Sequence, residues 1–225
     1  MANDYFRFKQ FTVHQGLCAM KVGTDGTLLG AWARGGRRIL DIGTGTGLIA
    51  LMMAQRYAEA HVTGIDIDDG AIEQARQNVA SSPFAARVSI NMLDVTAMPG
   101  EALFESIVCN PPFFVDSLHC PDDRRTMARH ADTLSYRKLM ASAQRLLTDD
   151  GELSVVIPFD CRQRLEAEAA LAGLFKVRTC AVKTTPAKAP RRFLLAFRKH
   201  TAPLEQSELV LCSEAYKELT KEFFL

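Results

Sequence analysis

The residues best suited to chemistry are the consecutive Asn110-Pro111-Pro112-Phe113. Two prolines in succession remove two backbone donors and fix two φ angles, so the carbonyl groups of this segment hold a defined orientation. The side-chain oxygen of Asn110 and the carbonyl oxygen of Pro111 can then accept both hydrogens of one planar amine, such as adenine N6 or a glutamine amide. This draws the nitrogen toward tetrahedral geometry and localises its lone pair, while Phe113 can stack on a planar substrate. The motif predicts activation of a weakly nucleophilic nitrogen; an Asn-Pro turn without chemistry is the alternative.

A second candidate site is the glycine-rich segment Asp41–Gly47, DIGTGTG, between a predicted strand and a predicted helix. Glycines at such a turn let the backbone approach a ligand, and the N–H groups of the helix point toward it. A nucleoside-containing ligand is therefore expected. The dinucleotide fingerprint GxGxxG is not met, because Gly47 comes one residue early and Leu48 occupies the expected glycine position. This departure weakens a dehydrogenase interpretation.

Two carboxylates follow later predicted strands. Asp66 ends a strand 23 residues after Gly43, where a carboxylate accepts hydrogen bonds from both ribose hydroxyls. Nucleoside cofactors of different chemistry share that ribose, so Asp66 does not indicate which of these cofactors is bound. Asp68 and Asp69 are interpreted as the N-cap region of the next helix. Asp94 follows the third strand and is either a ligand-binding acid or a turn residue.

The elements that must position these residues alternate as short apolar runs and helical patterns, which indicates βαβ units in an α/β fold with a mostly parallel sheet. The last two strands leave no room for a crossover helix and are expected to pair antiparallel. Seven strands are predicted, over Arg38–Ile42, His61–Asp66, Arg87–Asn91, Phe104–Cys109, Gly151–Ile157, Phe175–Val182 and Arg192–Arg198. Four helices are predicted over Leu48–Tyr57, Asp69–Ala80, Leu134–Leu147 and Cys161–Leu171.

The chain is expected to form one domain over residues 1–225. Within it, a short N-terminal extension (1–36) is expected to cover the sheet and to precede a Rossmann-like core (37–200). The final segment (201–225) is expected to be a closing helix, because Glu205–Phe223 is amphipathic.

Charge is distributed unevenly, although the net charge is +1. The stretch from Ala170 to Leu204 has no acidic residue and carries eight basic ones: Lys176, Arg178, Lys183, Lys188, Arg191, Arg192, Arg198 and Lys199. A second basic group lies after the Asn-Pro-Pro segment: Arg124, Arg125, Arg129, Arg137 and Lys138. These segments predict either a phosphate-binding surface or an ordinary solvated face.

Composition excludes several other classes of protein. With 48% hydrophobic and 24% charged residues the chain is neither disordered nor fibrous, and no run approaches 18 apolar residues, so no membrane span is expected. The six cysteines include no CxxC pair, which favours reduced thiols in the cytoplasm, and Cys109 is interpreted as a packing residue. The five histidines do not cluster, and no metal site is predicted.

Taken together, the motifs resemble those of class I S-adenosylmethionine-dependent methyltransferases that act on amino groups. The DxGxGxG spacing is similar to their motif I, and Asn110–Phe113 to their catalytic motif. More narrowly, the chain resembles the bacterial tRNA1(Val) adenine-N6 methyltransferase family through almost its whole length. The most specific part of this resemblance is Cys18–Ala33; Phe8–Phe11 with Val13 adds to it.

The resemblance implies S-adenosyl-L-methionine as cofactor. In that family the glycine turn holds the amino-acid end of the cofactor, a strand-end acid binds the ribose, and a later acid accepts from the adenine amine. The segment before the first strand lies over the cofactor there, which implies that residues 1–36 cover the cofactor site here. Where the family often has glutamate at the ribose position, this chain has Asp66, whose shorter carboxylate should keep the role. The implied cofactor-binding residues are Lys21, Thr24, Asp25, Asp41, Gly43, Gly45, Gly47, Asp66, Asp94 and Asn110.

The implied reaction is methylation of N6 of adenine 37, beside the anticodon of tRNA1(Val), with Asn110, Pro111, Pro112 and Phe113 as the catalytic residues. The nitrogen attacks a sulfonium methyl group in line and loses its proton afterwards, so no strong base is needed. A cytoplasmic monomer without metal is expected. The expected RNA-binding residues are Arg124, Arg125, Arg129, Lys183, Lys188, Arg191 and Arg192.

Two other functions fit parts of the pattern. A protein glutamine-N5 methyltransferase acting on release factors uses the same Asn-Pro-Pro-aromatic chemistry on a carboxamide, but it does not require an acid-free basic strand pair. A nucleotide-binding module that has lost its chemistry fits the glycine turn alone, and the intact Asn110–Phe113 segment argues against it.

Overall fold

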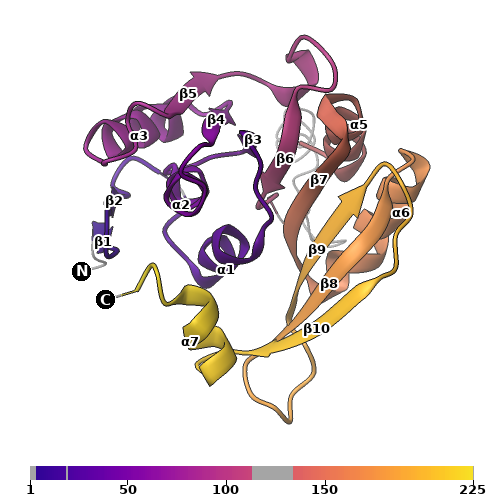
Figure 1. Cartoon of the computed structure of the whole chain (residues 1–225). Coiled ribbons are helices and arrows are strands. Elements are labelled where there is room, and N and C mark those ends of the chain that lie inside the picture. The colour runs from indigo at the N-terminus through magenta and orange to yellow at the C-terminus, as the bar shows by residue number, and fades with distance from the viewer. Residues whose placement is uncertain (1–3, 19, 113–133, 225) are drawn as a thin grey trace, which may run out of the picture.

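The computed structural model describes residues 4–18, 20–112 and 134–224 (Figure 1). The predicted residues Phe113, Arg124, Arg125 and Arg129 lie outside them. The strands are β1 (Tyr5–Arg7), β2 (Thr12–His14), β3 (Arg38–Ile42), β4 (His61–Asp66), β5 (Val88–Met92), β6 (Phe104–Cys109), β7 (Leu147–Pro158), β8 (Phe175–Lys183), β9 (Arg192–Arg198) and β10 (Glu205–Val210). The α-helices are α1 (Thr24–Trp32), α2 (Leu48–Arg56), α3 (Asp69–Ala80), α5 (Tyr136–Leu146), α6 (Arg162–Leu171) and α7 (Glu214–Thr220), and two 3-10 turns are η1 (Val95–Ala97) and η2 (Phe159–Cys161).

The large sheet has the strand order β10-β8-β9-β7-β6-β3-β4-β5. In the described part of the chain β9 alone runs against its neighbours, pairing antiparallel with both β7 and β8. The α/β class, the mostly parallel sheet and the single reversed strand are therefore confirmed. In residues 4–18, 20–112 and 134–224 the sheet contains eight strands where seven were predicted, and a separate two-stranded sheet joins β1 to β2.

Apolar residues of the central strands alternate between two helical layers. Ile39 packs into a core shared with α1, α2 and α3, whereas Leu40 and Ile42 pack into a second core with α5 and α6. In Figure 1 these two groups of helices lie on opposite sides of the sheet. Because both faces are covered, the strands are almost continuously apolar, as parallel sheets require.

The C-terminal segment departs from the predicted closing helix. Residues 205–210 form β10, which pairs parallel with β8, and only Glu214–Thr220 are helical. Without β10, the outer edge of β8 would expose a row of unpaired backbone groups. Glu208 lies 2.6 Å from Lys183 of β8, an ion pair that helical periodicity does not reveal. The helical prediction for this part was therefore wrong.

The N-terminal segment divides into parts with different positions. The β1–β2 hairpin packs on α3, where the Asn78 side chain bonds the backbone of His14, and on the C-terminal segment, where Lys9 N donates to Phe223 O at 2.8 Å. The two chain ends consequently lie side by side (Figure 1). The segment between β2 and α1 is the part that reaches the carboxyl edge of the sheet, where Met20 contacts Asn110.

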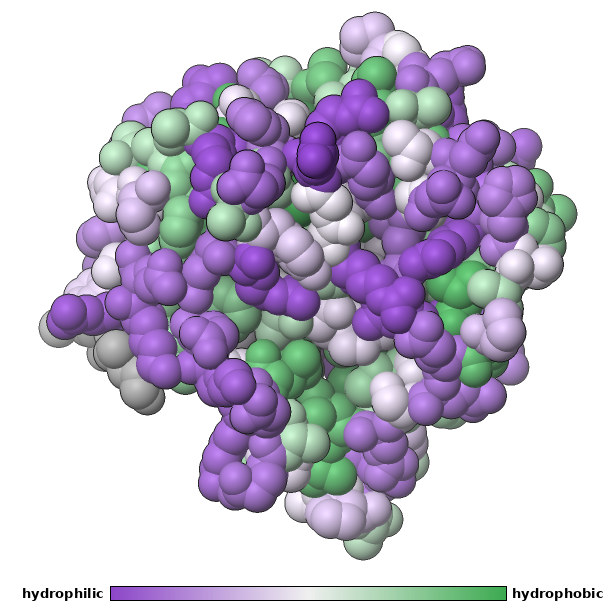
Figure 2. Space-filling view, in the orientation of Figure 1, coloured by the Kyte–Doolittle hydropathy of each residue, from purple (hydrophilic) through white to green (hydrophobic). Residues whose placement is uncertain are grey.

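The outer surface is mixed in character. Hydrophilic side chains cover most of the face in Figure 2, and an apolar area lies beside α7 in the lower centre of the view. Of the helices that the structure describes, none has the length and apolar character needed to cross a bilayer.

Candidate active site

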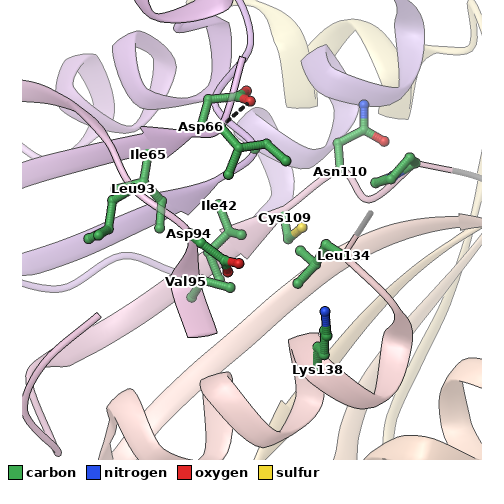
Figure 3. A pocket seen from close by; sticks show the side chains of 13 residues that line it. Ile42, Ile65, Asp66, Leu93, Asp94, Val95, Cys109, Asn110, Leu134 and Lys138 are labelled. Atoms are coloured by element: carbon green, nitrogen blue, oxygen red, sulfur yellow. Dashed lines mark hydrogen bonds between the residues drawn. The ribbon is translucent and has the colours of Figure 1, made fainter. Parts of the chain in front are cut away.

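A cavity of about 210 Å³ opens at the carboxyl ends of β6, β3, β4 and β5 (Figure 3). In sequence β3 is followed by β4 and β5 on one side, and the chain then returns to place β6 on the other. Ligands of open α/β sheets bind at such a switch point. The cavity is lined by Ile42, Gly43, Ile65, Asp66, Ile67, Leu93, Asp94, Val95, Cys109, Asn110, Pro112, Leu134 and Lys138.

The three glycines of the turn all have positive φ: 69° at Gly43, 54° at Gly45 and 79° at Gly47. Only glycine adopts this region without strain. A Cβ on Gly43 would meet nothing within 4 Å, and one on Gly45 only a backbone oxygen at 4.0 Å, so both face open space. A Cβ on Gly47 would lie 3.4 Å from Ala75 of α3. The first two glycines therefore allow a ligand to approach. At Gly47 a Cβ would make only an ordinary contact with α3, so glycine is favoured there by its positive φ.

Asp41 lies beneath this turn and does not line the cavity. Its side chain is fully buried, and its Oδ2 accepts from Thr44 Oγ1 at 2.7 Å and from Ala50 N at 3.1 Å. Burial raises the pKa of Asp41 to about 7, against the lowering effect of these two hydrogen bonds. Asp41 thus fixes the turn to the start of α2 from below.

The other two predicted carboxylates line the cavity. Asp66 accepts from Gly45 N at 2.9 Å through Oδ2 and from Ile67 N at 2.8 Å through Oδ1, so the turn and the carboxylate hold each other in place. Asp94 accepts from Thr96 N at 2.8 Å and caps η1. It is therefore a turn residue and a cavity acid at once. Asp68 caps α3 by accepting from Ala71 N at 2.7 Å, which confirms the N-cap interpretation.

Asn110 follows β6 directly at the rim of the cavity. Its side-chain oxygen Oδ1 is buried and has no hydrogen-bond partner among the described residues, while its Nδ2 lies 3.9 Å from Met20 Sδ. An unpaired buried acceptor costs about 1–3 kcal/mol, and such groups call for an explanation. Pro111 is buried and Pro112 lines the cavity, so the rigid segment is in place beside this acceptor.

Cys109 precedes Asn110 and also lines the cavity. It is fully buried, and burial followed by the nearby Asp41 and Asp66 carboxylates raises its pKa well above the usual value for a thiol. A neutral buried thiol is a poor nucleophile. The structure thus agrees with the interpretation of Cys109 as a packing residue.

The residues predicted from the N-terminal segment lie apart from the cavity lining. Lys21 and Thr24 are exposed, and Asp25 in the first turn of α1 accepts from Arg192 Nε at 2.8 Å. Asp25 therefore joins α1 to the start of β9. The roles of Lys21, Thr24 and Asp25 in cofactor binding remain predictions.

The basic stretch is free of acids in sequence but not in space. Lys188 and Arg191 are exposed, and neither has an ion pair within residues 4–18, 20–112 and 134–224. The other six basic residues pair with acids that lie outside the stretch, as Lys176–Glu166, Arg178–Glu152, Lys183–Glu208, Arg192–Asp25, Arg198–Glu152 and Lys199–Asp149. The stretch was expected to be either a phosphate-binding surface or an ordinary solvated face. Among the described residues, ion pairs leave two of its eight basic side chains for a phosphate-binding surface.

Several cavity residues carry no motif that marks them in the sequence. Lys138 of α5 lines the cavity from below in Figure 3, across from Asp66 and Asn110, and Leu134 lies next to it. The sequence placed Lys138 in a basic group but gave no sign that α5 begins over the carboxyl edge. Apolar residues at strand ends, such as Ile42 and Ile65, complete the lining. No three His, Cys, Asp or Glu side chains of the described residues gather as metal ligands would.

The chain is similar in sequence to known methyltransferases. Residues 26–187 match the family described as methyltransferase small domain. The tRNA1(Val) (adenine(37)-N6)-methyltransferase of Bacteroides thetaiotaomicron is 47% identical over 100% of this chain and 99% of its own length, and that of Phocaeicola vulgatus is 48% identical over 100% and 99%. The corresponding protein of Mannheimia succiniciproducens is 42% identical over 98% of this chain and 94% of its own length.

Solved structures agree on the fold. A predicted O-methyltransferase from Agrobacterium tumefaciens has a TM-score of 0.70 at 19% identity, covering 88% of this chain and 96% of that one. The glycopeptide N-methyltransferase MtfA, solved with (S)-adenosyl-L-methionine, has a TM-score of 0.59 at 13% identity, covering 80% and 90%. The Rossmann-like methyltransferase fold predicted from the sequence is confirmed.

Proposed function

We propose, since the chain belongs to the tRNA1(Val) (adenine(37)-N6)-methyltransferase family, that it methylates N6 of adenine 37 in tRNA1(Val) with S-adenosylmethionine as methyl donor. The observation that carries the proposal is Oδ1 of Asn110, which is buried at the rim of the cavity and has no hydrogen-bond partner among the described residues. It is an acceptor available to a donor at the place where the amine must enter.

The residues of the cavity fit the donor. The open side of Gly43 and Gly45 admits the amino-acid end, the Asp66 carboxylate suits ribose hydroxyls, and Asp94 suits the adenine amine. Ile42, Ile65 and Val95 supply an apolar wall for the adenine ring. When bound, the cofactor supplies a methyl group on a cationic sulfur.

Asn110 and Pro111 act on the acceptor. Asn110 Oδ1 and the Pro111 carbonyl accept the two N6 hydrogens, which holds the lone pair toward the donor side and excludes water from it. Because the prolines hold this arrangement before the substrate arrives, little reorganisation is needed during the reaction. Alignment of this kind supplies about 7–11 kcal/mol in favourable cases. The extra proton leaves to solvent after transfer, so no strong base is required.

The RNA must present its base outside a stack. An adenine in the anticodon loop is already unpaired, and its extrusion lies at the low end of the few kcal/mol that base flipping costs. We propose that the chain acts as a monomer in the cytoplasm, where its tRNA substrate occurs.

The test uses the purified full chain with methyl-labelled S-adenosylmethionine. The acceptors are unmodified tRNA1(Val), the same transcript with guanosine at position 37, and a release factor. We expect label in the first transcript alone, recovered as N6-methyladenosine by nucleoside mass spectrometry. Label in the release factor, or equal label in both transcripts, would refute the proposal.

A further inference from the structure

Phe159 is an exposed aromatic side chain at the carboxyl edge of the sheet. It follows β7 directly and retains 55% of its accessible surface. Since β7 runs parallel to β6, with Val155 beside Cys109, the end of β7 lies at the same edge as Asn110. The strand order places β7 on the far side of β6 from the glycine turn. Phe159 therefore lies on the side of Asn110 that faces away from the cofactor cavity.

The surroundings of Phe159 hold it in place. Its backbone N–H donates to Arg191 O at 3.1 Å, and its ring centroid lies 6.1 Å from that of the buried Phe193. The guanidinium carbon of Arg162 lies 4.3 Å from the Phe193 centroid, so a cation–π contact braces the supporting ring. An aromatic ring that is supported from below and keeps more than half of its surface exposed is suited to stacking on a base.

The segment that contacts the backbone of Phe159 carries two basic residues. Arg191, whose backbone contacts Phe159, and Lys188 in the preceding turn are exposed, and no ion pair engages either within the part of the chain that the structure describes. Arg192 is instead held by Asp25. The exposed Asp160 is the acid adjacent in sequence, and it leaves two cations to one anion at this place. An exposed aromatic side chain, next to a segment with two cations that have no ion pair among the described residues, suits a nucleotide base and its phosphates.

Phe159 is within reach of the reacting amine. Met20 contacts Asn110, and Asp25, five residues later, contacts Arg192 beside Phe159. An extended chain spans at most about 3.6 Å per residue, so the Cα atoms of Met20 and Asp25 are separated by no more than about 18 Å. A short stretch of single-stranded RNA covers such a span.

We propose that Phe159 is a stacking platform for an unpaired base neighbouring the target adenine in the anticodon loop, with Lys188 and Arg191 contacting its phosphates. The inference deepens the proposed function and rests on it. It separates the carboxyl edge into a donor side, built around the glycine turn, and an acceptor side, built around Phe159.

The test compares variants for binding to an anticodon stem-loop of tRNA1(Val), measured by fluorescence anisotropy with cofactor present. Loss of one base–aromatic stack corresponds to about 5- to 150-fold weaker binding, which we expect for Phe159→Ala. Phe159→Leu, which keeps an apolar side chain but lacks a π face, should bind as weakly as Phe159→Ala, whereas Phe159→Tyr should bind like the wild type. Phe175→Ala is the matched control, because Phe175 is 45% exposed but begins β8 at the opposite edge of the sheet.

The outcomes separate the inference from the proposed function. Wild-type affinity in both Phe159→Ala and Phe159→Leu, with methylation of the tRNA intact, overturns the platform and leaves the proposed function standing. Wild-type affinity in Phe159→Leu alone shows apolar packing and overturns stacking. A wild-type protein that methylates no tRNA refutes the proposed function, and the platform with it. Calorimetric titration of the cofactor should give the wild-type affinity in every variant.

Discussion

The donor side and the acceptor side of the carboxyl edge are built in different ways. On the donor side, the conformations of Gly43, Gly45 and Gly47 and the hydrogen bonds of Asp66 are set within a few residues or between adjacent strands. On the acceptor side, Asn110 and Phe159 come from segments about fifty residues apart in sequence. They lie at the same edge of the sheet only because β6 and β7 are neighbouring parallel strands.

This difference explains what each side contributes. The donor side depends on backbone conformation, which few residue types satisfy, so it is sensitive to a single methyl group. The acceptor side depends on side-chain groups that have no partner of their own in the described residues, such as Asn110 Oδ1. Substitutions on the two sides should therefore separate cofactor binding from methyl transfer and RNA binding.

The largest expected effect comes from Asn110→Ala on the acceptor side. Removing one preorganised polar group at a reacting centre typically costs about 10²- to 10³-fold in rate, and we expect a loss of that size in single-turnover methylation of tRNA1(Val). Cofactor affinity, measured by calorimetry, should fall far less than the rate, although Asn110 also lines the cofactor cavity. An unchanged rate would contradict the role of Asn110.

On the donor side, Gly45→Ala should weaken cofactor binding and leave RNA binding unchanged. The left-handed conformation costs about 1–2 kcal/mol for a residue with a Cβ, which corresponds to about 5- to 30-fold in affinity if binding restores the turn. Gly16→Ala is the matched control, because a Cβ there meets nothing within 4 Å and no left-handed φ is involved. Equal cofactor affinities in the two variants would argue against the turn as the donor site.

Free and paired cations should differ in their effect on RNA binding. The double variant Lys188→Ala/Arg191→Ala should bind the stem-loop several-fold more weakly and reduce the slope of log affinity against log salt by about 1.4, at about 0.7 per phosphate contact. Lys183→Ala, which removes a cation already paired with Glu208 at 2.6 Å, should alter the slope less. A larger change of slope for Lys183→Ala than for the double variant would contradict the assignment of phosphate contacts to Lys188 and Arg191.

The last prediction concerns stability rather than activity, through the buried Asp41 beneath the glycine turn. Burial raises its pKa from 3.8 to about 7 in the folded protein, so the folded state holds this proton more tightly than the unfolded state. The contribution of Asp41 to the free energy of unfolding is therefore most favourable below about pH 4. It is lost as the pH rises from about 4 to 7, and it does not change further above pH 7. Since a tenfold change in proton affinity corresponds to about 1.4 kcal/mol, the wild type should lose up to about 4 kcal/mol relative to Asp41→Asn over this range.

Urea titrations of both proteins at several pH values measure this difference. If the free energies of unfolding of wild type and Asp41→Asn changed with pH in parallel, the assigned pKa would be contradicted.

The sequence predicted the donor side well because its determinants are local. The strands Arg38–Ile42 and His61–Asp66 have the predicted bounds, and the glycine pattern between them marks left-handed conformations directly. Asn110 was also found, since its two prolines follow it in sequence.

What the sequence missed depends on contacts between distant segments. The acid-free stretch gave no sign that Glu152 and Glu166 would pair with its cations, because both precede it in the chain. The segment that forms β10 was predicted as helix from its amphipathic spacing. Its pairing with β8, about thirty residues earlier in the chain, leaves no local pattern in the sequence. Phe159 and Lys138 acquire their positions from strand order and helix packing, which no local pattern encodes.

The most direct test of the central claim is a crystal structure of the chain with S-adenosylhomocysteine and the anticodon stem-loop of tRNA1(Val). We predict adenine 37 extruded from the loop, with its N6 within about 2.7–3.2 Å of both Asn110 Oδ1 and the Pro111 carbonyl oxygen. An adenine whose N6 is turned away from both oxygens in that complex would contradict the account.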